Sequence, residues 1–241
     1  MTRQRGTARL RRFGPRVSRR DFLATGLAAV VAPSVPLVGQ PRQTPRFSSP
    51  PFSLGVASGD PSPDGVVLWT RLAPVPLEGG GMPDEMVEVH WEVARDERMT
   101  EVVQRGTVVA MPEQGHSVHV EVAGLDADRW YWYRFRSGAE ASRVGRTRTL
   151  PLSGTSVQRL NMAFVSCQHY ETGYFAAYRH MLNDDLDVVF HLGDYIYEYE
   201  GRDGRARKHT GDEIELLSDY RNRYALYRLD PDLQAAHARF P

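Results

Sequence analysis

The sequence has 241 residues, enough for one or two domains, and its 41% hydrophobic and 25% charged residues are typical of a globular protein. Lysine and arginine together number 30, as do aspartate and glutamate, so the formal net charge at neutral pH is zero. This balance does not indicate a protein that binds nucleic acid by general electrostatic attraction, and we expect no specific nucleic-acid recognition.

The N-terminal region, residues 1–50, has the composition of an export signal followed by a linker. Residues 1–20 contain eight arginines and no acidic residue, and the apolar run 22–31 follows them. That run is too short for a permanent membrane span. Arg19 and Arg20 lie in the twin-arginine pattern, which directs folded proteins to the twin-arginine translocation machinery. We therefore expect a periplasmic or secreted protein; the alternative is a disordered basic tail.

Residues 51–150 are predicted to form an antiparallel β-sandwich. Short hydrophobic runs, several of them strictly alternating, are separated by turn-forming residues at spacings typical of such a module. The main runs are 66–71, 87–93, 107–110, 117–122 and 130–135. The aromatic residues of the last run are predicted to be core rather than a stacking platform for a ligand. The turn at Gly124 and the following Tyr131 resemble fibronectin type III and immunoglobulin-like modules, in which a tyrosine locks a corner.

The segment after this last run is predicted to be an edge strand. Arg143, Arg146 and Arg148 alternate along it. Alternating charge on an edge strand is most simply a solvent-exposed face.

The segment 160–200 predicts a strand, a helix and a second strand. The runs 162–165 and 186–192 are nearly continuous in hydrophobic residues, as in parallel strands of a sheet that is covered on both faces. Between them, Phe175, Tyr178 and Met181 recur at three-residue spacing, which predicts a helix packed on the sheet.

Polar residues follow both predicted strands. Cys167 and His169 follow the first strand, and Asp194 follows the second. Because ligands of open α/β sheets bind at the carboxyl ends of the strands, we expect these three side chains to converge. Cys167 is the single cysteine and cannot form an intrachain disulfide. A lone cysteine is usually a small buried residue, but its place at a strand end favours a role as a ligand or reactive group.

The C-terminal segment 219–237 is predicted to be one helical stretch. Tyr220, Tyr224 and Tyr227 are expected on its core-facing side. Arg221, Arg223 and Arg228 are interspersed with them. These arginines are predicted to be surface charge, with phosphate binding as the alternative.

Several blocks of the sequence resemble the PhoD-type alkaline phosphatases of the calcineurin-like metallophosphoesterase superfamily. They are the leader and the segments FSLGVASGDPSPDGVVLWTRL, SCQHYETGYFAAYRHMLNDDLDVVFHLGDYIYEY and YRNRYALYRLDPDLQAAHARFP. The resemblance implies an α+β two-domain fold, with a β-sandwich over 51–150 and the first part of an α/β metallophosphoesterase domain over 158–241. It also implies twin-arginine export and a centre of Fe³⁺ and Ca²⁺.

The resemblance also implies roles for individual residues. Cys167 corresponds to a thiolate ligand of iron, Asp194 to the catalytic carboxylate that bridges iron and calcium, and Tyr197 to a phenolate ligand of iron. These types suit the metals, because Fe³⁺ favours anionic ligands and Ca²⁺ accepts oxygen ligands in flexible number. Packing is the alternative for Tyr197. His169 is a candidate metal ligand or a partner of one, and an ordinary hydrogen-bonded histidine is equally compatible.

The function implied by the resemblance is an exported phosphatase that hydrolyses phosphate monoesters and diesters through metal-activated hydroxide. Further metal and phosphate-binding motifs of the superfamily are not found before Pro241. We therefore expect an incomplete chain with little activity alone. The alternative is a non-catalytic exported interaction module with a vestigial phosphoesterase half-domain.

Overall fold

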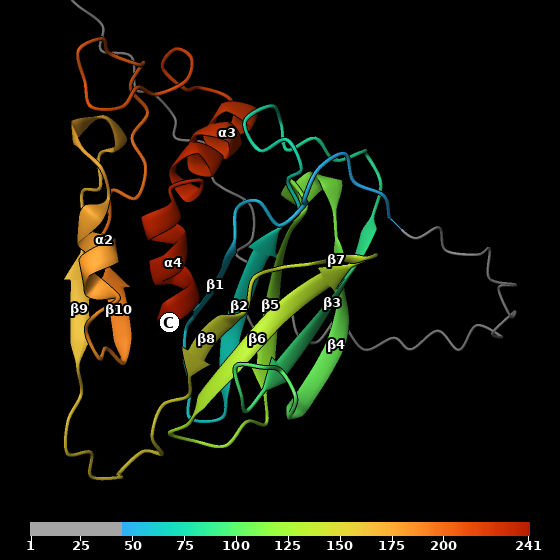
Figure 1. The fold of residues 1–241 in the computed structure, drawn as a ribbon, viewed down its shortest axis with the longest axis vertical. Coiled ribbons are helices and arrows are strands. Elements are labelled where there is room, and N and C mark those ends of the chain that lie inside the picture. Colours follow the sequence, from blue (N-terminus) through green and yellow to red (C-terminus); the bar gives the residue numbers. More distant parts are fainter. Residues whose placement is uncertain (1–44) are drawn as a thin grey trace, which may run out of the picture. The chain divides into compact units, whose positions relative to one another are not determined.

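The computed structural model describes residues 45–241, whose elements are labelled in Figure 1. Arg19 and Arg20 lie outside the described residues. Two antiparallel sheets come first. The smaller sheet has the order β1 (Val56–Gly59), β2 (Gly65–Arg71), β5 (Ser117–Ala123). The larger has the order β4 (Val102–Ala110), β3 (Val87–Ala94), β6 (Trp130–Ser137), β7 (Glu140–Ala141), and β8 (Gly145–Arg148) also pairs with β6. The short 3₁₀ helix η1 (Pro112–Gln114) joins β4 to β5.

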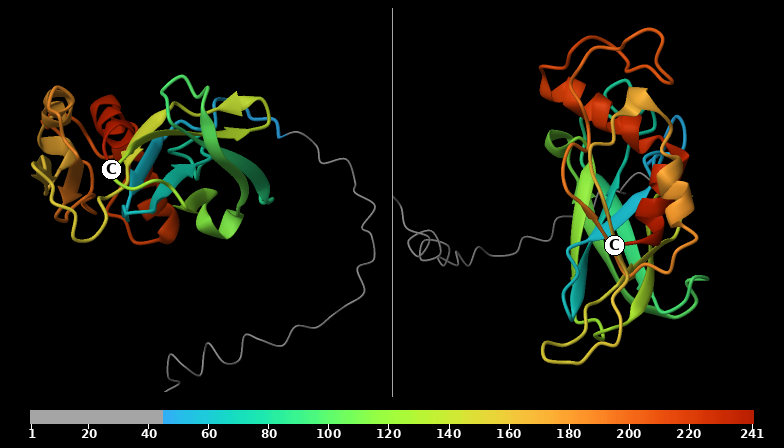
Figure 2. Two further views of the ribbon diagram at one scale, coloured as in Figure 1. Left: turned by 90° about the horizontal axis from the view of Figure 1, so that it is seen from below. Right: turned by 90° about the vertical axis from the view of Figure 1, so that its left-hand side faces the viewer.

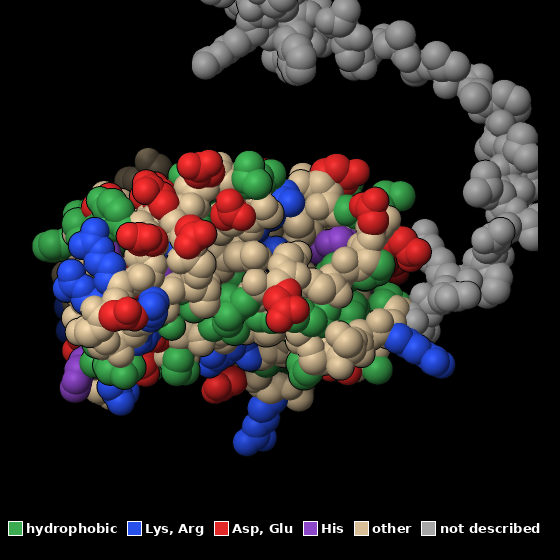
Figure 3. Space-filling view, turned by 90° about the horizontal axis from the view of Figure 1, so that it is seen from above, with side chains coloured by type: hydrophobic (Ala, Val, Ile, Leu, Met, Phe, Trp, Pro, Cys, Tyr) green, Lys and Arg blue, Asp and Glu red, His purple; other side chains and the backbone are tan. Residues whose placement is uncertain are grey.

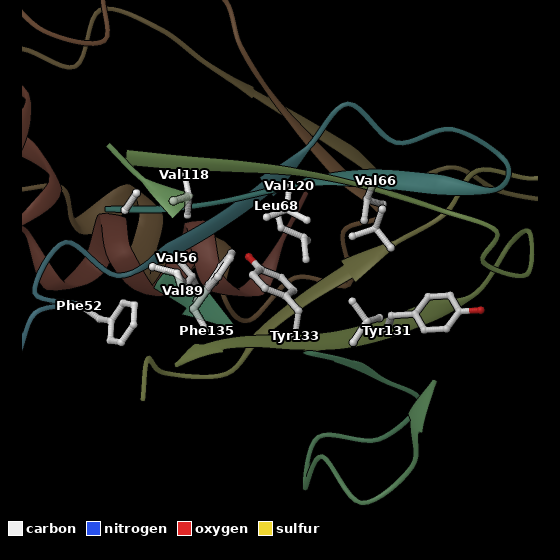
Figure 4. Packing of buried hydrophobic residues seen from close by; sticks show 14 of the residues in the cluster. Phe52, Val56, Val66, Leu68, Val89, Val118, Val120, Tyr131, Tyr133 and Phe135 are labelled. Carbon is white, nitrogen blue, oxygen red and sulfur yellow. The ribbon is translucent and has the colours of Figure 1, made fainter. Parts of the chain in front are cut away.

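The core of these sheets forms because alternate residues of a strand point to opposite faces. In β6, Tyr131, Tyr133 and Phe135 are buried at alternate positions. They pack in one cluster with Leu68 of β2 and Val120 of β5 from the other sheet, as Figure 4 shows. The prediction that the aromatic residues of this run are core is therefore confirmed for these three, whereas Trp130 and Trp132, at the intervening positions, are half-buried.

The expected tyrosine corner is also present. The backbone N–H of Asp126 donates a hydrogen bond to the hydroxyl of Tyr131 at 2.9 Å. Gly124, at the start of this turn, has a φ of 80°, a left-handed conformation that favours glycine. The turn and the strand after it are thus joined through one side chain.

The segment that follows forms the predicted strand, helix and strand. Strands β9 (Met162–Val165) and β10 (Val188–His191) pair in parallel, and η2 (Tyr170–Thr172) and α2 (Ala176–Met181) lie between them in the chain. Phe175, Tyr178 and Met181 are buried in one cluster with residues of the C-terminal helices. The predicted apolar stripe of the helix is therefore confirmed.

The expectation that this sheet is covered on both faces is wrong for the described residues. Phe164 is 73% exposed and Phe190 is 49% exposed, although each lies within a strand. The neighbouring positions Ala163 and Val189 pack against the helical cluster instead. Because strand residues alternate, the helices cover one face, and these phenylalanines belong to the other.

The predicted single helix over 219–237 is in fact two, α3 (Leu217–Arg228) and α4 (Pro231–Arg239). Pro231 has no N–H to continue a helix, and it suits the first turn of a new one. The carboxylate of Asp230 accepts hydrogen bonds from the N–H groups of Asp232 and Leu233, both at 3.0 Å. The break therefore has an N-cap and a proline that the sequence already carries.

Two of the arginines predicted at the surface of this segment are buried. Arg223 is 1% exposed and Arg228 is 0% exposed. Arg228 donates hydrogen bonds to the carbonyl oxygens of Leu54, at 2.9 and 3.2 Å, and Val56, at 3.1 Å. Each guanidinium is compensated by backbone carbonyls from distant segments. The tyrosine prediction holds for Tyr227, which is fully buried, whereas Tyr220 is 38% exposed.

The face of β8 is likewise less solvated than predicted. The Arg146 guanidinium lies 3.8 Å from the ring centroid of Trp130, and its Nε donates to the carbonyl oxygen of Arg239 on α4 at 3.2 Å. Arg148 forms ion pairs with Asp128 and Asp187. Arg143 is exposed, as expected.

Helix α4 contacts both the sandwich and the other helices. It packs against β1 and β8 on one side and α2 on the other (Figures 1 and 2). Ala238 belongs to the core cluster of the sandwich, whereas Leu233 and Ala236 belong to the helical cluster. Within residues 45–241, no helix has both the length and the apolar character needed to cross a membrane.

Candidate metal centre

The ends of β9 and β10 are held together beyond their last paired residues. The N–H of Cys167 donates to the carbonyl oxygen of Gly193 at 3.1 Å, and that of Gln168 donates to the carbonyl oxygen of Asp194 at 3.3 Å. Cys167 and Asp194 have φ values of 55° and 54°. Such left-handed conformations are uncommon outside glycine and concentrate at functional sites. Here they bring Sγ of Cys167 to 3.6 Å from Oδ2 of Asp194.

Tyr197 completes this cluster. Its hydroxyl donates a hydrogen bond to the same Oδ2 of Asp194 at 2.9 Å. Partial removal from water raises the pKa of the Tyr197 phenol, and its hydrogen bond to Asp194 and the negative charge of that carboxylate raise it further. The structure thus brings together the three residues that the sequence singled out as metal ligands.

The chemistry of this donor set fits a metal ion. A thiol, a carboxylate and a phenol meet at one point, and none of them brings a positive charge. Such groups become anionic ligands when a cation replaces their protons. Residues 45–241 contain no group of three or more His, Cys, Asp and Glu placed to hold a metal ion. The cluster has two residues of those types, and its third member is a tyrosine.

His169 lies beside the cluster rather than within its hydrogen bonds. Its Nδ1 accepts the N–H of Glu171 at 3.2 Å, so it caps η2. Its ring centroid lies 4.7 Å from that of Tyr197. The observed contacts are therefore those of a residue that packs against the candidate phenol ligand.

Tyrosines occupy three alternate positions, 195, 197 and 199, and their surroundings differ. Tyr195 stacks on Tyr224, with ring centroids 5.5 Å apart, and its hydroxyl hydrogen-bonds to Nε2 of His237 at 2.9 Å. Tyr199 is 46% exposed. Tyr197 is the member of this alternating set that reaches Asp194.

The sequence did not predict the role of one buried carboxylate, Glu171, close to the loop that follows Tyr197. Glu171 is 1% exposed, and its Oε1 accepts the backbone N–H groups of Arg202 and His209, both at 2.9 Å. Burial alone would raise the pKa of Glu171, but these hydrogen bonds outweigh it and hold the pKa below its usual value. Glu171 therefore anchors the loop that follows Tyr197.

His209 is a second anchor of this loop. Its Nδ1–H donates to the carbonyl oxygen of Tyr199 at 3.0 Å, and its Nε2 accepts the hydroxyl of Tyr227 at 3.0 Å. Burial, with a smaller effect from Arg223, lowers the pKa of His209 to about 4. The loop carries no hydrophobic periodicity, and the partners of Glu171 and His209 are far away in the sequence. The sequence pattern therefore could not predict that these two residues hold the loop.

The loop over residues 197–212 carries charges of both signs. Its exposed cations are Arg202, Arg205 and Lys208, and its exposed carboxylates are Glu198, Glu200, Asp203 and Asp212; Lys208 pairs with Asp203 at 2.6 Å. In Figure 3, Lys and Arg side chains gather toward one edge of the face, and Asp and Glu side chains are spread across it. The loop therefore presents no field of a single sign.

Comparison with known proteins shows the family to which this chain belongs. Residues 39–151 match the N-terminal domain of PhoD-like phosphatases, and residues 162–241 match the PhoD-like phosphatase domain. The chain belongs to the PhoD-like phosphatase family.

Two relatives show how much of such a protein the chain represents. It is 57% identical over 202 residues to alkaline phosphatase D of Bacillus subtilis (strain 168), which covers 82% of this chain and 35% of that protein. It is also similar to a solved chain titled "Structure of PhoD", with a TM-score of 0.80 and 57% identity, covering 82% of this chain and 39% of that one. The chain thus spans little more than a third of these relatives.

Proposed function

We propose that this chain forms part of the catalytic centre of a metal-dependent hydrolase of phosphate monoesters and diesters. The observation that carries the proposal is the convergence of Cys167, Asp194 and Tyr197 at the carboxyl ends of two parallel strands. Such strand ends are where open α/β sheets bind their ligands. Membership of a phosphatase family supplies the reaction class.

The donor set suggests which metals the site takes. We assign Fe³⁺ to the side of Cys167 and Tyr197, because a thiolate and a phenolate are strong anionic donors. We assign Asp194 a role between Fe³⁺ and Ca²⁺, since a carboxylate has two oxygens and Ca²⁺ prefers oxygen ligands. Bound together, the metals would supply Lewis-acid stabilisation of charge on the phosphoryl group.

The protein's own residues would hold this arrangement in place. The strand-end hydrogen bonds fix the backbones of Cys167 and Asp194 relative to each other. The ring of His169 packs against that of Tyr197 and restricts its movement. Positioned groups of this kind are effective because they need not reorganise when charge develops.

The activity is best tested in a chimera, because the chain spans 35% of its relative. In alkaline phosphatase D of Bacillus subtilis, the matching segment would be replaced by the aligned residues of this chain. We expect the chimera to hydrolyse p-nitrophenyl phosphate and bis-p-nitrophenyl phosphate. Asp194→Asn should abolish both activities, because a neutral amide cannot bridge two cations. The exposed Asp184→Asn is the matched control and should leave them unchanged.

A non-catalytic interaction module makes the opposite prediction for the same pair of variants. Asp194→Asn and Asp184→Asn would then behave alike in the chimera. That result would remove the assignment of Asp194 as a catalytic metal ligand.

We also propose that the protein is exported by the twin-arginine route. The proposal rests on Arg19 and Arg20 and on the short apolar run after them. A protein that folds before export can receive its metals in the cytoplasm, which suits the metal centre proposed above.

A further inference from the structure

Arg223 of α3 joins the two ends of the loop that carries Tyr197. Its Nη1 donates hydrogen bonds to the carbonyl oxygens of Tyr197 at 2.5 Å and Tyr199 at 2.9 Å. Its Nη2 donates to the carbonyl oxygens of Asp212 at 3.3 Å and Thr210 at 3.5 Å. One side chain thus contacts both the beginning and the end of the segment 197–212, which we call the site loop.

Burying the charged guanidinium of Arg223 costs free energy unless hydrogen bonds compensate for the lost water. Arg223 is 1% exposed, and burial is the main cause that lowers the pKa of its guanidinium. All four of its hydrogen bonds go to backbone carbonyls and none goes to a carboxylate. A buried cation without close ionic compensation needs several acceptors, and the planar guanidinium is the side chain that can serve several at once. The two Nη atoms of Arg223 have such acceptors, whereas its Nε is buried without a hydrogen-bond partner.

The middle of the site loop is held by two other residues, Glu171 and His209. Glu171 accepts the N–H groups of Arg202 and His209, and His209 donates to the carbonyl of Tyr199. Tyr199 therefore receives hydrogen bonds from both Arg223 and His209. The contacts of Arg223 lie nearest to Tyr197, whose hydroxyl must reach Asp194.

We propose that Arg223 is a positioning residue for Tyr197, which it serves by closing the ends of the site loop. The carbonyl of Tyr197 is fixed by Arg223, and the phenol of the same residue then extends to Oδ2 of Asp194. This inference rests on the proposed function, in which Tyr197 is a metal ligand. A purely structural role, limited to the packing of α3, is the competing explanation.

Arg228 provides a matched control on the same helix. It is equally buried and also donates to backbone carbonyls, but these belong to Leu54 and Val56 of the sandwich. Arg223→Lys and Arg228→Lys both keep the charge and lose the planar fork. We expect both to lower the thermal unfolding midpoint, because each leaves buried carbonyls without donors.

The first measurement is hydrogen–deuterium exchange of the full 241-residue chain without metal. Peptides of the site loop should exchange about tenfold faster in Arg223→Lys than in the wild type, and Arg228→Lys should leave them unchanged. Arg223→Gln, with a shorter planar donor group, replaces the lysine variant if that variant does not fold. Equal exchange of the site loop in the two variants would overturn the inference.

The second measurement is the visible absorbance of the Bacillus subtilis chimera described above after Fe³⁺ is added. A phenolate bound to Fe³⁺ gives a charge-transfer band, which Arg223→Lys should weaken or shift and Arg228→Lys should preserve. An unchanged band in Arg223→Lys would overturn the inference. The exchange measurement needs no metal, so absence of the band from the wild type would count against the proposed metal site and not against the positioning of the loop.

Discussion

Arg148, in the last strand of the sandwich, forms an ion pair with Asp187, which directly precedes β10. The same guanidinium pairs with Asp128, and the other carboxylate oxygen of Asp187 accepts the N–H of Asn161 at 2.9 Å. The two parts of the chain that the resemblance separates are therefore joined by a network of charged hydrogen bonds. Partly buried networks of this kind contribute more than isolated surface pairs.

Replacement of Arg148 should destabilise the described unit measurably. The side chains of Arg148 and Asp187 are 26% and 16% exposed. We expect Arg148→Gln to lower the free energy of unfolding by roughly 1–3 kcal/mol, as for other hydrogen bonds to charged groups. Arg159→Gln is the control, because its pair with Asp185 has side chains 70% and 82% exposed and should contribute less than about 0.5 kcal/mol. Equal denaturant midpoints for the two variants would contradict this account.

The tyrosine corner gives a second stability prediction. Tyr131 is 1% exposed, and its hydroxyl accepts the N–H of Asp126. Tyr131→Phe keeps the buried ring and removes that acceptor, so it should cost about 1 kcal/mol in chemical denaturation. Tyr220→Phe, at a position 38% exposed, should change the stability by a few tenths of a kcal/mol or less. A neutral Tyr131→Phe would show that the corner bond does not hold the turn.

Acid should weaken the site loop through His209. The pKa of His209 falls from 6.5 to about 4 in the folded chain, chiefly through burial. The unfolded chain therefore binds this proton at higher pH than the folded chain, and the free energy of unfolding should fall as the pH drops from 6.5 toward 4. His209→Gln should reduce the slope of the free energy of unfolding in that window, and His237, whose pKa burial also lowers, should leave a residual slope. His180→Gln, at an exposed position on α2, should retain the wild-type slope.

Export should depend on the paired arginines of the leader. Conversion of both Arg19 and Arg20 to lysine keeps the charge but removes the address that the translocation machinery reads. We expect the double variant to accumulate in the cytoplasm of a bacterial host, as measured by fractionation and immunoblotting. Conversion of Arg11 and Arg12, an adjacent arginine pair outside the pattern, is the control. Unchanged export of the first variant would refute the twin-arginine assignment.

The sequence predicted correctly those elements in which the local pattern of hydrophobic residues matches the face that the fold buries. The alternation in 130–135 becomes the inward face of β6, and the two strand ends bring Cys167 next to Asp194. The break at Asp230 and Pro231 was also readable, because an N-cap residue followed by proline begins a helix. In that case a longer apparent periodicity concealed a clear local signal.

The buried arginines could not be predicted in the same way. An arginine among tyrosines has the same local sequence pattern whether water or a distant carbonyl accepts its hydrogen bonds. Arg223 and Arg228 can be buried because the fold places backbone carbonyls next to α3. Those that Arg223 contacts belong to the site loop, and those that Arg228 contacts belong to Leu54 and Val56. Those contacts depend on the tertiary fold. Glu171 is similar, since its partners are N–H groups more than 30 residues further along the chain.

The central claim is that Cys167, Asp194 and Tyr197 hold a metal ion, and titration with Fe³⁺ of the Bacillus subtilis chimera described above, in which the unsubstituted chimera serves as the wild type, tests it most directly. We expect the wild type to develop a visible phenolate-to-iron charge-transfer band. Tyr197→Phe should lose this band, because it keeps the ring and removes the ligand oxygen, whereas Tyr199→Phe should retain it. A band of unchanged intensity in Tyr197→Phe, or no band in the wild type, would contradict the assignment of the site.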